Sequence, residues 1–254
     1  MDTEDLVKLC ETLSLAEEEE AEFLMDGEVQ REGIGGVERC LVGKVLSRKK
    51  VNREGFMKVI EQIWNVIETV EIEMISDNIF MFQFSLLEDR GMVWSRGPCH
   101  FDQKLIILEK PKGAGEVMKM EFKRTELQVQ LFNIPLMCMN RSSARQLANM
   151  VGKAIEIPSD SKECRGKFVR VNVEIDVTRP LKRAIKLRLD EFNSMITIPI
   201  KYERLPEFCY GCRVLGHSLH DCMDKTARRE AMEGSMTKYG DWLRAVPMGR
   251  LKSA

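Results

Sequence analysis

The stretch CYGCRVLGHSLHDC, residues 209 to 222, holds three of the eight cysteines and two of the three histidines of the chain. Thiolates and imidazoles are common ligands of protein-bound zinc, and a structural zinc ion takes four of them in a tetrahedron. The spacing Cys-x2-Cys-x4-His-x4-Cys supplies that number through Cys209, Cys212, His217 and Cys222. Because four protein ligands leave no position open for water, we expect one Zn2+ ion with a structural role.

The chain around these ligands must fold tightly. Gly211 and Gly216 stand inside the stretch, and we expect both to adopt backbone angles that other residues avoid. His220 could compete with His217 as a ligand, but it would leave a single residue before Cys222. We therefore expect His220 to be exposed.

Three residues of this stretch that bind no metal in this scheme are candidate nucleic-acid contacts: Tyr210, Arg213 and Leu219. So short a segment has no core of its own, and its remaining apolar side chains tend to form a binding face on which bases stack. For Tyr210 an alternative is packing against Tyr202 and Phe208, and both interpretations stay open.

Phosphate contacts must come from elsewhere, because residues 201–230 hold six bases against five acids. Residues 162–189 hold nine bases against three acids, and alternating strands there would carry the bases toward the cysteine stretch. A basic sheet face of this kind could follow the backbone of a single strand. The alternative is an ordinary solvated sheet face. The candidate phosphate contacts are Arg170, Lys182, Arg183, Lys186 and Arg188.

The net charge of −1 hides an asymmetry. Residues 1–38 hold thirteen acids and two bases, and the rest of the chain carries +10. Such an acidic arm is typical of a solvated helix or a disordered tail, and it could also compete with nucleic acid for the basic body. No apolar run approaches the length of a membrane helix, and the acidic N-terminus does not resemble a secretory signal. We expect a protein of the nucleus or cytoplasm that is not secreted.

Apolar periodicity predicts an α+β chain, beginning with a domain over residues 39–112. Strands are expected at 40–46, 70–75, 79–86 and 103–110, and helices at 52–67 and 87–95. This βαββαβ order is that of the ferredoxin-like fold, which RNA-recognition modules share. Phe82 and Phe84 fall on the core face of the third strand, and Ile79 and Met81 fall on the open face. The aromatic platform on which such modules stack bases is therefore missing.

A second α+β unit is predicted over residues 113–204. It has a helix at 140–154, capped by Asn140, and strands at 127–135, 154–158, 168–177, 184–189 and 195–203. Strict alternation of apolar and polar residues in these strands predicts a half-buried antiparallel sheet with a partly basic open face. Before the two units we expect an acidic arm with a Gly-rich hinge at residues 1–38, where the hinge is a loop at 26–38. After them we expect a metal-binding segment at residues 205–225 and a C-terminal tail at residues 226–254. Metal removal should unfold only about residues 206–225.

No catalytic motif stands out: the sequence has no HExxH, no GxxxxGK[ST] and no GxSxG. We expect a binding protein that is not an enzyme, has no small-molecule substrate and does not enter a membrane. The favoured partner is single-stranded RNA or DNA. The alternative is a protein-interaction or self-assembly module, in which the metal only stabilises the fold of the C-terminal segment and self-association is possible.

CYGCRVLGHSLHDC resembles the CCHC zinc knuckle of retroviral and retrotransposon nucleocapsid-type proteins. The longer stretch KYERLPEFCYGCRVLGHSLHDC is similar to the plant variety that follows a domain of unknown function in retrotransposon-derived proteins. FVRVNVEIDVTRPLKRAIKLRL and YGDWLRA support the resemblance, which covers roughly residues 35–245. It implies a zinc-binding, nucleic-acid-binding protein that derives from a retrotransposon.

Overall fold

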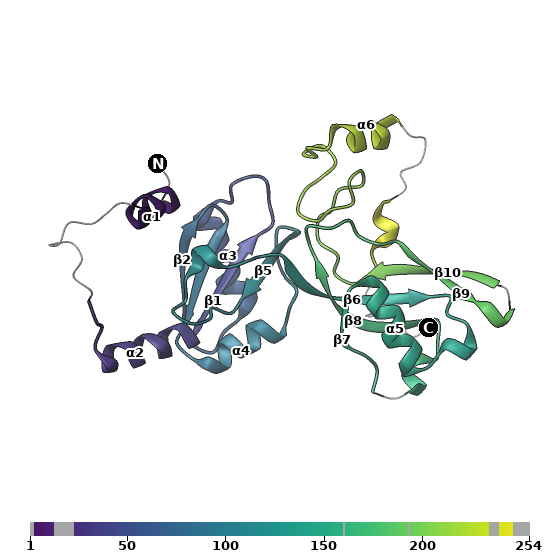
Figure 1. Cartoon of the computed structure of the whole chain (residues 1–254), viewed down its shortest axis with the longest axis horizontal. Helices are drawn as coiled ribbons and strands as arrows, with labels where there is room; N and C mark the ends of the chain where they lie inside the picture. The colour runs from purple at the N-terminus through teal and green to yellow at the C-terminus, as the bar shows by residue number, and fades with distance from the viewer. Residues whose placement is uncertain (1–2, 13–22, 160, 193, 234–238, 246–254) are drawn as a thin grey trace.

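The computed structural model of the chain describes residues 3–12, 23–159, 161–192, 194–233 and 239–245. These residues form two five-stranded antiparallel sheets, and residues 205–225, called the knuckle segment below, lie where the two sheets meet (Figure 1). The predicted α+β class is confirmed. None of the helices that the structure describes is long and apolar enough to cross a membrane.

Two helices precede the first sheet, α1 (Thr3–Thr12) and α2 (Gly27–Glu38). The loop predicted at 26–38 is therefore wrong. The Asp26 side chain caps α2 by accepting a hydrogen bond from the Glu28 backbone N–H at 2.7 Å, which offsets the low helix propensity of the glycines that follow. Of the two alternatives for the acidic arm, a helix is observed at α1, and residues 13–22 lie outside the described part of the chain.

The first sheet follows the predicted βαββαβ order, with one additional strand. Its strands run in space β2-β3-β1-β5-β4. Only β4 was not predicted; it forms a hairpin with β5 in which Cys99 pairs with Ile106. The elements are β1 (Cys40–Val45), α3 (Arg53–Trp64), β2 (Val70–Ser76), β3 (Ile79–Phe84), α4 (Leu87–Ser95), β4 (Cys99–Phe101) and β5 (Lys104–Glu109).

An aromatic core joins the first sheet to its helices. Phe80, Phe82 and Phe84 are completely buried, as the alternation in β3 predicts, and Ile79 and Met81 are partly exposed on the other face. The Phe56 ring of α3 stacks on Phe80 with the ring centroids 3.9 Å apart. Stacked rings of this kind contribute beyond their buried area.

The second sheet has the strand order β7-β8-β6-β10-β9, and α5 packs on one of its faces. Val169, Val171 and Val173 point inward and are buried, whereas the alternate residues of β8 are partly exposed, as predicted. Asn140 caps α5 by accepting a hydrogen bond from the Ser143 N–H at 3.0 Å. The elements are β6 (Arg124–Phe132), α5 (Arg141–Val151), β7 (Lys153–Glu156), β8 (Phe168–Asp176), β9 (Ala184–Leu189) and β10 (Ser194–Tyr202).

The region predicted as a C-terminal tail contains regular structure in its described residues. It forms α6 (Lys225–Glu233) and a 3-10 turn, η5 (Asp241–Leu243). Tyr239, Leu243 and Ala245 are buried, and the Ala245 N–H donates to the Tyr202 carbonyl at 2.8 Å. The described end of the chain therefore packs against the C-terminal end of β10. A further 3-10 turn, η1 (Val117–Lys119), lies in the link between the two sheets.

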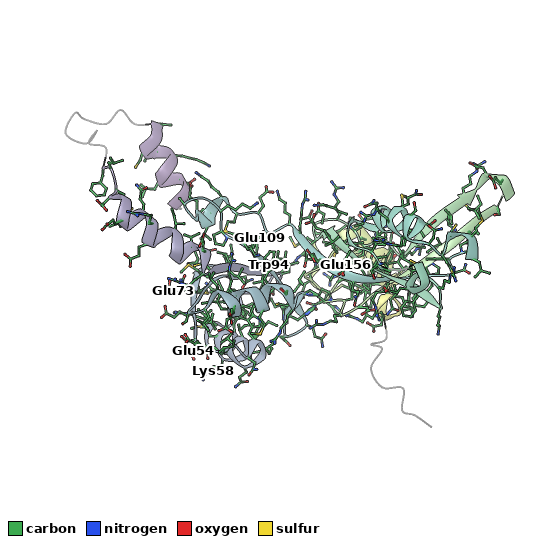
Figure 2. The ribbon with its side chains drawn as sticks, turned by 90° about the horizontal axis from the view of Figure 1, so that it is seen from below. Glu54, Lys58, Glu73, Trp94, Glu109 and Glu156 are labelled. Atoms are coloured by element: carbon green, nitrogen blue, oxygen red, sulfur yellow. The ribbon has the colours of Figure 1, made fainter. Side chains whose placement is uncertain are left out.

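One apolar cluster unites the two sheets with the knuckle segment. It holds Val42 and Leu105 of the first sheet, Ile198 of the second, and Phe208 and Leu215 of the knuckle segment. Figure 2 shows Trp94 and Glu109 on the side of the first unit that faces the second, with Glu54 and Lys58 at its far end. The face of the first sheet that β3 leaves open is thus covered in part by the rest of the chain.

Candidate metal centre

The four predicted ligands come together in the knuckle segment. One ligand atom each of Cys209, Cys212, His217 and Cys222 lies within 4.8 Å of the other three, and the Cys212 Sγ is 3.2 Å from His217 Nε2. Metal–sulfur bonds of about 2.3 Å and metal–nitrogen bonds of about 2.0 Å place tetrahedral ligand atoms roughly 3.5 to 3.8 Å apart. The cluster therefore fits a small tetrahedral ion.

Backbone hydrogen bonds hold the first two ligands in a tight turn. The Arg213 N–H donates to the Cys209 carbonyl and the Cys209 N–H donates to the Val214 carbonyl, both at 2.9 Å. Arg213 and Gly216 have positive φ angles of 70° and 87°. The prediction for Gly211 is wrong in its reason: its φ is not positive, and a Cβ there would lie 2.8 Å from the Ala227 carbonyl oxygen. Gly211 is needed for close approach to α6.

The surroundings favour neutral side chains in the absence of a cation. Burial raises the pKa of the Cys212 thiol to about 12, and the sulfur atoms of Cys209 and Cys222 add to the shift. Burial also lowers the pKa of His217, with a further contribution from Arg48. A neutral imidazole is ready to bind a metal, and a divalent cation would stabilise the thiolates.

Contacts with the first sheet hold the knuckle segment in place. The Glu207 N–H donates to the Gln103 carbonyl at 2.9 Å, and an ammonium–carboxylate pair joins Lys49 to Asp221 at 3.6 Å. Arg48 also donates to the Asp221 carbonyl. These basic residues belong to the loop after β1, some 160 positions before the metal ligands in the sequence. The run SRKK at 47–50 marks the loop as basic, but nothing in the sequence places it beside the knuckle segment.

The second sheet holds the knuckle segment from the other side. The Leu181 N–H, in the β8–β9 connection, donates to the Arg213 carbonyl at 2.9 Å. The Tyr210 ring packs on Phe208 with centroids 5.0 Å apart, and its hydroxyl lies 2.8 Å from the Asp241 carboxylate. Of the two alternatives for Tyr210, packing on Phe208 is thus observed, and the ring remains partly exposed.

The other candidate contacts of the knuckle segment lie at its surface. Arg213 is exposed, with its guanidinium 5.6 Å from the Tyr239 ring centroid. Leu219 is partly exposed beside Gly211, and His220 is exposed as predicted. All three are therefore accessible to a ligand.

The five candidate phosphate contacts of the second sheet divide between two surfaces. Arg170, Lys186 and Arg188 lie on the open face, where Arg170 pairs with Glu203 at 2.7 Å. Arg188 pairs with Asp190 at 2.8 Å, and Lys186 donates to the Thr197 hydroxyl at 2.6 Å.

The other two, Lys182 and Arg183, lie in the β8–β9 connection. Lys182 donates to the Met150 carbonyl near the end of α5, and the Arg183 guanidinium lies 5.5 Å from the Tyr239 ring centroid. A run of bases in the sequence therefore does not form one continuous basic surface.

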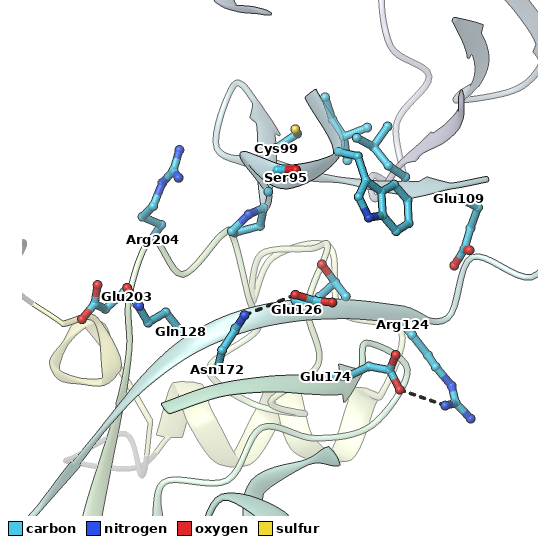
Figure 3. A pocket seen from close by; sticks show the side chains of 16 residues that line it. Ser95, Cys99, Glu109, Arg124, Glu126, Gln128, Asn172, Glu174, Glu203 and Arg204 are labelled. Carbon is cyan, nitrogen blue, oxygen red and sulfur yellow. Dashed lines mark hydrogen bonds and ion pairs between the residues drawn. The ribbon is translucent and has the colours of Figure 1, made fainter. Parts of the chain in front are cut away.

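A cavity of about 530 Å³ lies between the two sheets and is called the inter-sheet cavity (Figure 3). Four carboxylates line it, from Glu109, Glu126, Glu174 and Glu203. Arg124 pairs with Glu174 at 2.9 Å, and the Asn172 amide donates to Glu126 at 3.2 Å. Burial raises the pKa of Glu109. Arg124 and Arg204 also line the cavity, so its carboxylates outnumber its guanidinium groups by four to two. This excess suits a cationic ligand better than a phosphate.

Comparisons with known proteins agree with this organisation. Residues 35–110 match the family described as Domain of unknown function (DUF4283), and residues 175–224 match the family described as Zinc knuckle. A segment of 98 residues is 29% identical to the Arabidopsis thaliana protein named Uncharacterized protein At4g02000. It makes up 38% of this chain and spans 31% of that protein. The chain thus carries a domain of unknown function followed by a zinc knuckle, as the resemblance in sequence implies.

Proposed function

We propose that this protein binds single-stranded RNA or DNA and that its knuckle segment is held by one structural Zn2+ ion. The observation that carries the proposal is the Cys3His cluster inside the part of the chain that matches the zinc knuckle family. Thiolate and imidazole ligands in a tetrahedral arrangement suit zinc. With four protein ligands, the ion would stabilise the fold and have no position for a reacting water.

The charges around the cluster support a nucleic-acid ligand. The loop after β1 brings Arg48 and Lys49 into contact with the knuckle segment, which is nearly neutral in its own sequence. The exposed Arg213 adds a further base at the same segment. Neutralised phosphates release counterions, so bases gathered at one place support binding without sequence preference.

We further propose that the protein descends from a retrotransposon, with which the domain order and the Arabidopsis relative agree, and that it acts by binding and not by catalysis. We place its action in the nucleus or cytoplasm, where its proposed ligand is found. An intracellular protein that binds nucleic acid needs no substrate pocket beyond the surface that meets the strand.

Binding can be measured by fluorescence anisotropy with single-stranded RNA and DNA between about 50 and about 200 mM salt. We expect zinc-loaded protein to bind, with the logarithm of affinity falling by about 0.7 per neutralised phosphate for each logarithm of salt. Cys222→Ser should lose the zinc and most of the affinity. Cys10→Ser is the matched control, because Cys10 is exposed in α1 and lies outside the cluster. Zinc-loaded protein that binds neither strand at low salt would contradict the proposal.

A protein-interaction or self-assembly module is the second candidate, and the open face of the second sheet favours it. Arg170 is paired there with the largely buried Glu203 carboxylate, so its charge is not free for a phosphate. The Leu136 and Met137 side chains, next to this sheet in sequence, are 85% and 57% exposed. Concentration-dependent association in light scattering, together with absent nucleic-acid binding, would select this function.

A further inference from the structure

A groove of about 710 Å³ lies directly beside the metal cluster and is called the knuckle groove. Three parts of the chain supply most of its lining: β1 with its following loop, residues 117–123, and residues 214–217 of the knuckle segment. Ile79 of β3 and the pair Val177 and Thr178 after β8 complete it. Its walls are mostly apolar, with Leu46, Ile79, Met118 and Val214 among them. A volume of this order is typical of ligand sites, which fall in the range of about 300 to 1,000 Å³.

Cationic side chains accompany these apolar walls. Lys44, Arg48 and Lys123 line the groove, and Glu121 is its only acid among the residues that the structure describes. Lys44 has no ion pair within the described part of the chain, and Lys123 pairs with Glu121 in an exposed position. Arg48 uses one bond on the Asp221 carbonyl and has further N–H donors.

The loop next to the groove adds more positive charge. Residues 47–53 hold four bases and no acid. Lys49 and Lys50 are 79% and 64% exposed, although each pairs with an aspartate. Exposed pairs of this kind are weak because water screens them, so a phosphate can replace the aspartate.

We infer that the knuckle groove holds one nucleotide of a single strand, with its base against the apolar walls and its flanking phosphates on Lys44, Arg48 and Lys123. This inference rests on the proposed nucleic-acid binding and gives it a location. Apolar walls with a cationic rim suit a ligand that has a flat apolar face and negative charge at its edges. Bases of a single strand can turn outward into such a site, whereas bases in a duplex are stacked and paired.

The groove depends on the metal cluster, because one of its walls is the chain that leads into His217. That wall approaches β1 so closely that a Cβ on Gly216 would lie 3.0 Å from the Leu46 Cβ. An unfolded knuckle segment would leave Lys44 and Ile79 without the opposite wall. Zinc would therefore act on nucleic-acid binding by forming the site.

The test compares groove variants in the anisotropy assay with a lysine far from the groove. Lys44→Gln and Lys123→Gln should each reduce the salt slope by about 0.7, whereas Lys58→Gln, exposed on α3, should leave it unchanged. Met118→Ala should leave the slope unchanged and weaken binding about fourfold for each methylene-sized group that the base no longer buries. Met118 is 54% exposed, so the substitution should not affect folding.

A photocrosslinking strand containing 4-thiouridine gives an independent result, and mass spectrometry should locate the crosslink within residues 117–123 or 214–217. Zinc content and thermal melting identify any variant that fails to fold. If the protein binds but the three groove variants match Lys58→Gln and crosslinks form elsewhere, the knuckle groove is not the site and the proposed function stands. If lysine variants respond but Met118→Ala does not, the base lies outside the groove. Absent binding by zinc-loaded protein would overturn both proposals.

Discussion

The inter-sheet cavity and the knuckle groove have similar volumes, about 530 and about 710 Å³, but opposite linings. Both form where segments distant in sequence meet. Four carboxylates and two guanidinium groups line the first, and three bases with one carboxylate line the second. A net charge of −1 for the whole chain therefore conceals two sites that would attract ligands of opposite sign.

The two linings differ in charge because different kinds of structural element carry their charged side chains. The floor of the inter-sheet cavity is an open sheet face on which opposite charges lie close together, as in the pair Arg124–Glu174 across β6 and β8 and the pair Arg170–Glu203. The three bases of the knuckle groove come from β1, from the loop after it and from the link between the sheets, and the pair Lys123–Glu121 lies in solvent. A count of bases along the sequence describes a segment, whereas a ligand meets the surface that several segments form.

Loss of the metal should have the largest effect on the structure, and it should remove the knuckle groove but not the inter-sheet cavity. Cys222→Ser leaves three ligands, and structural zinc contributes an apparent 10 to 16 kcal/mol in isolated zinc fingers. We expect metal analysis of the purified variant to show little zinc, while Cys10→Ser retains it. Arginine and lysine accessibility to labelling should rise around residues 44–50 and stay unchanged near Arg124. Full zinc in Cys222→Ser would contradict the ligand assignment.

Leu215→Ala should have the next largest effect and tests how far the knuckle groove is part of the core. Leu215 is 4% exposed and belongs to the cluster that includes both sheets. Buried leucine-to-alanine changes cost about 2 to 5 kcal/mol, so the main urea transition should move to lower concentration. Leu219→Ala, at a partly exposed position, should cost much less.

An unchanged main transition in Leu215→Ala, with only the knuckle segment lost, would contradict this coupling. It would support the expectation from sequence that residues 206–225 unfold alone. Far-UV circular dichroism reports the two sheets and zinc release reports the knuckle segment, so the two measurements separate these outcomes.

Much of the fold could be predicted from the sequence because its signals are local. Alternation identified β3 and β8 with their buried faces, and the Cys and His spacing identified the four ligands that the structure brings together. Helix α2 was missed because glycine content outweighed the single capping residue Asp26. Strand β4 was missed because three residues give too short a pattern to recognise.

The arrangement of the candidate site could not be predicted, because it depends on contacts across long sequence separations. No local sequence pattern indicates that Arg48 donates a hydrogen bond to the Asp221 carbonyl or that the Tyr210 hydroxyl donates to the Asp241 carboxylate. Such contacts follow from the packing of Leu215 among residues of both sheets. The strand order of each sheet has to be known before these neighbours can be identified.

Gly216→Ala should lower stability less than Leu215→Ala does. It adds a side chain to the wall that separates the metal cluster from β1. Gly216 has a φ of 87°, and an added Cβ would lie 3.0 Å from the Leu46 Cβ. The left-handed backbone alone costs other residues about 1 to 2 kcal/mol. We expect a lower urea midpoint. Gly91→Ala is the control, because Gly91 lies in α4 with open space around it, and alanine should stabilise the helix by about 1 kcal/mol. Equal effects of the two substitutions would show that the groove wall tolerates a side chain.

Glu109→Gln should have the smallest effect and tests the acidic character of the inter-sheet cavity. Burial raises the pKa of Glu109 and the nearby Glu174 raises it further, while Lys112 and Arg124 act in the opposite direction.

At low pH the Glu109 carboxyl is protonated in the folded and the unfolded chain, so it has no effect on the pH dependence of stability. As the pH rises through the ordinary glutamate range, about 4 to 5, the unfolded chain loses the proton first, and the folded chain loses stability until its own carboxylate has formed. Glutamine has no such cost, so the unfolding free energy of Glu109→Gln should gain on that of the parent as the pH rises above about 4, and then stay level once the folded carboxylate has formed. Urea unfolding across this range measures the difference. If instead the unfolding free energy of the parent rises relative to that of Glu109→Gln as the pH rises, Arg124 and Lys112 outweigh burial. The cavity would then be less acidic than its carboxylates suggest.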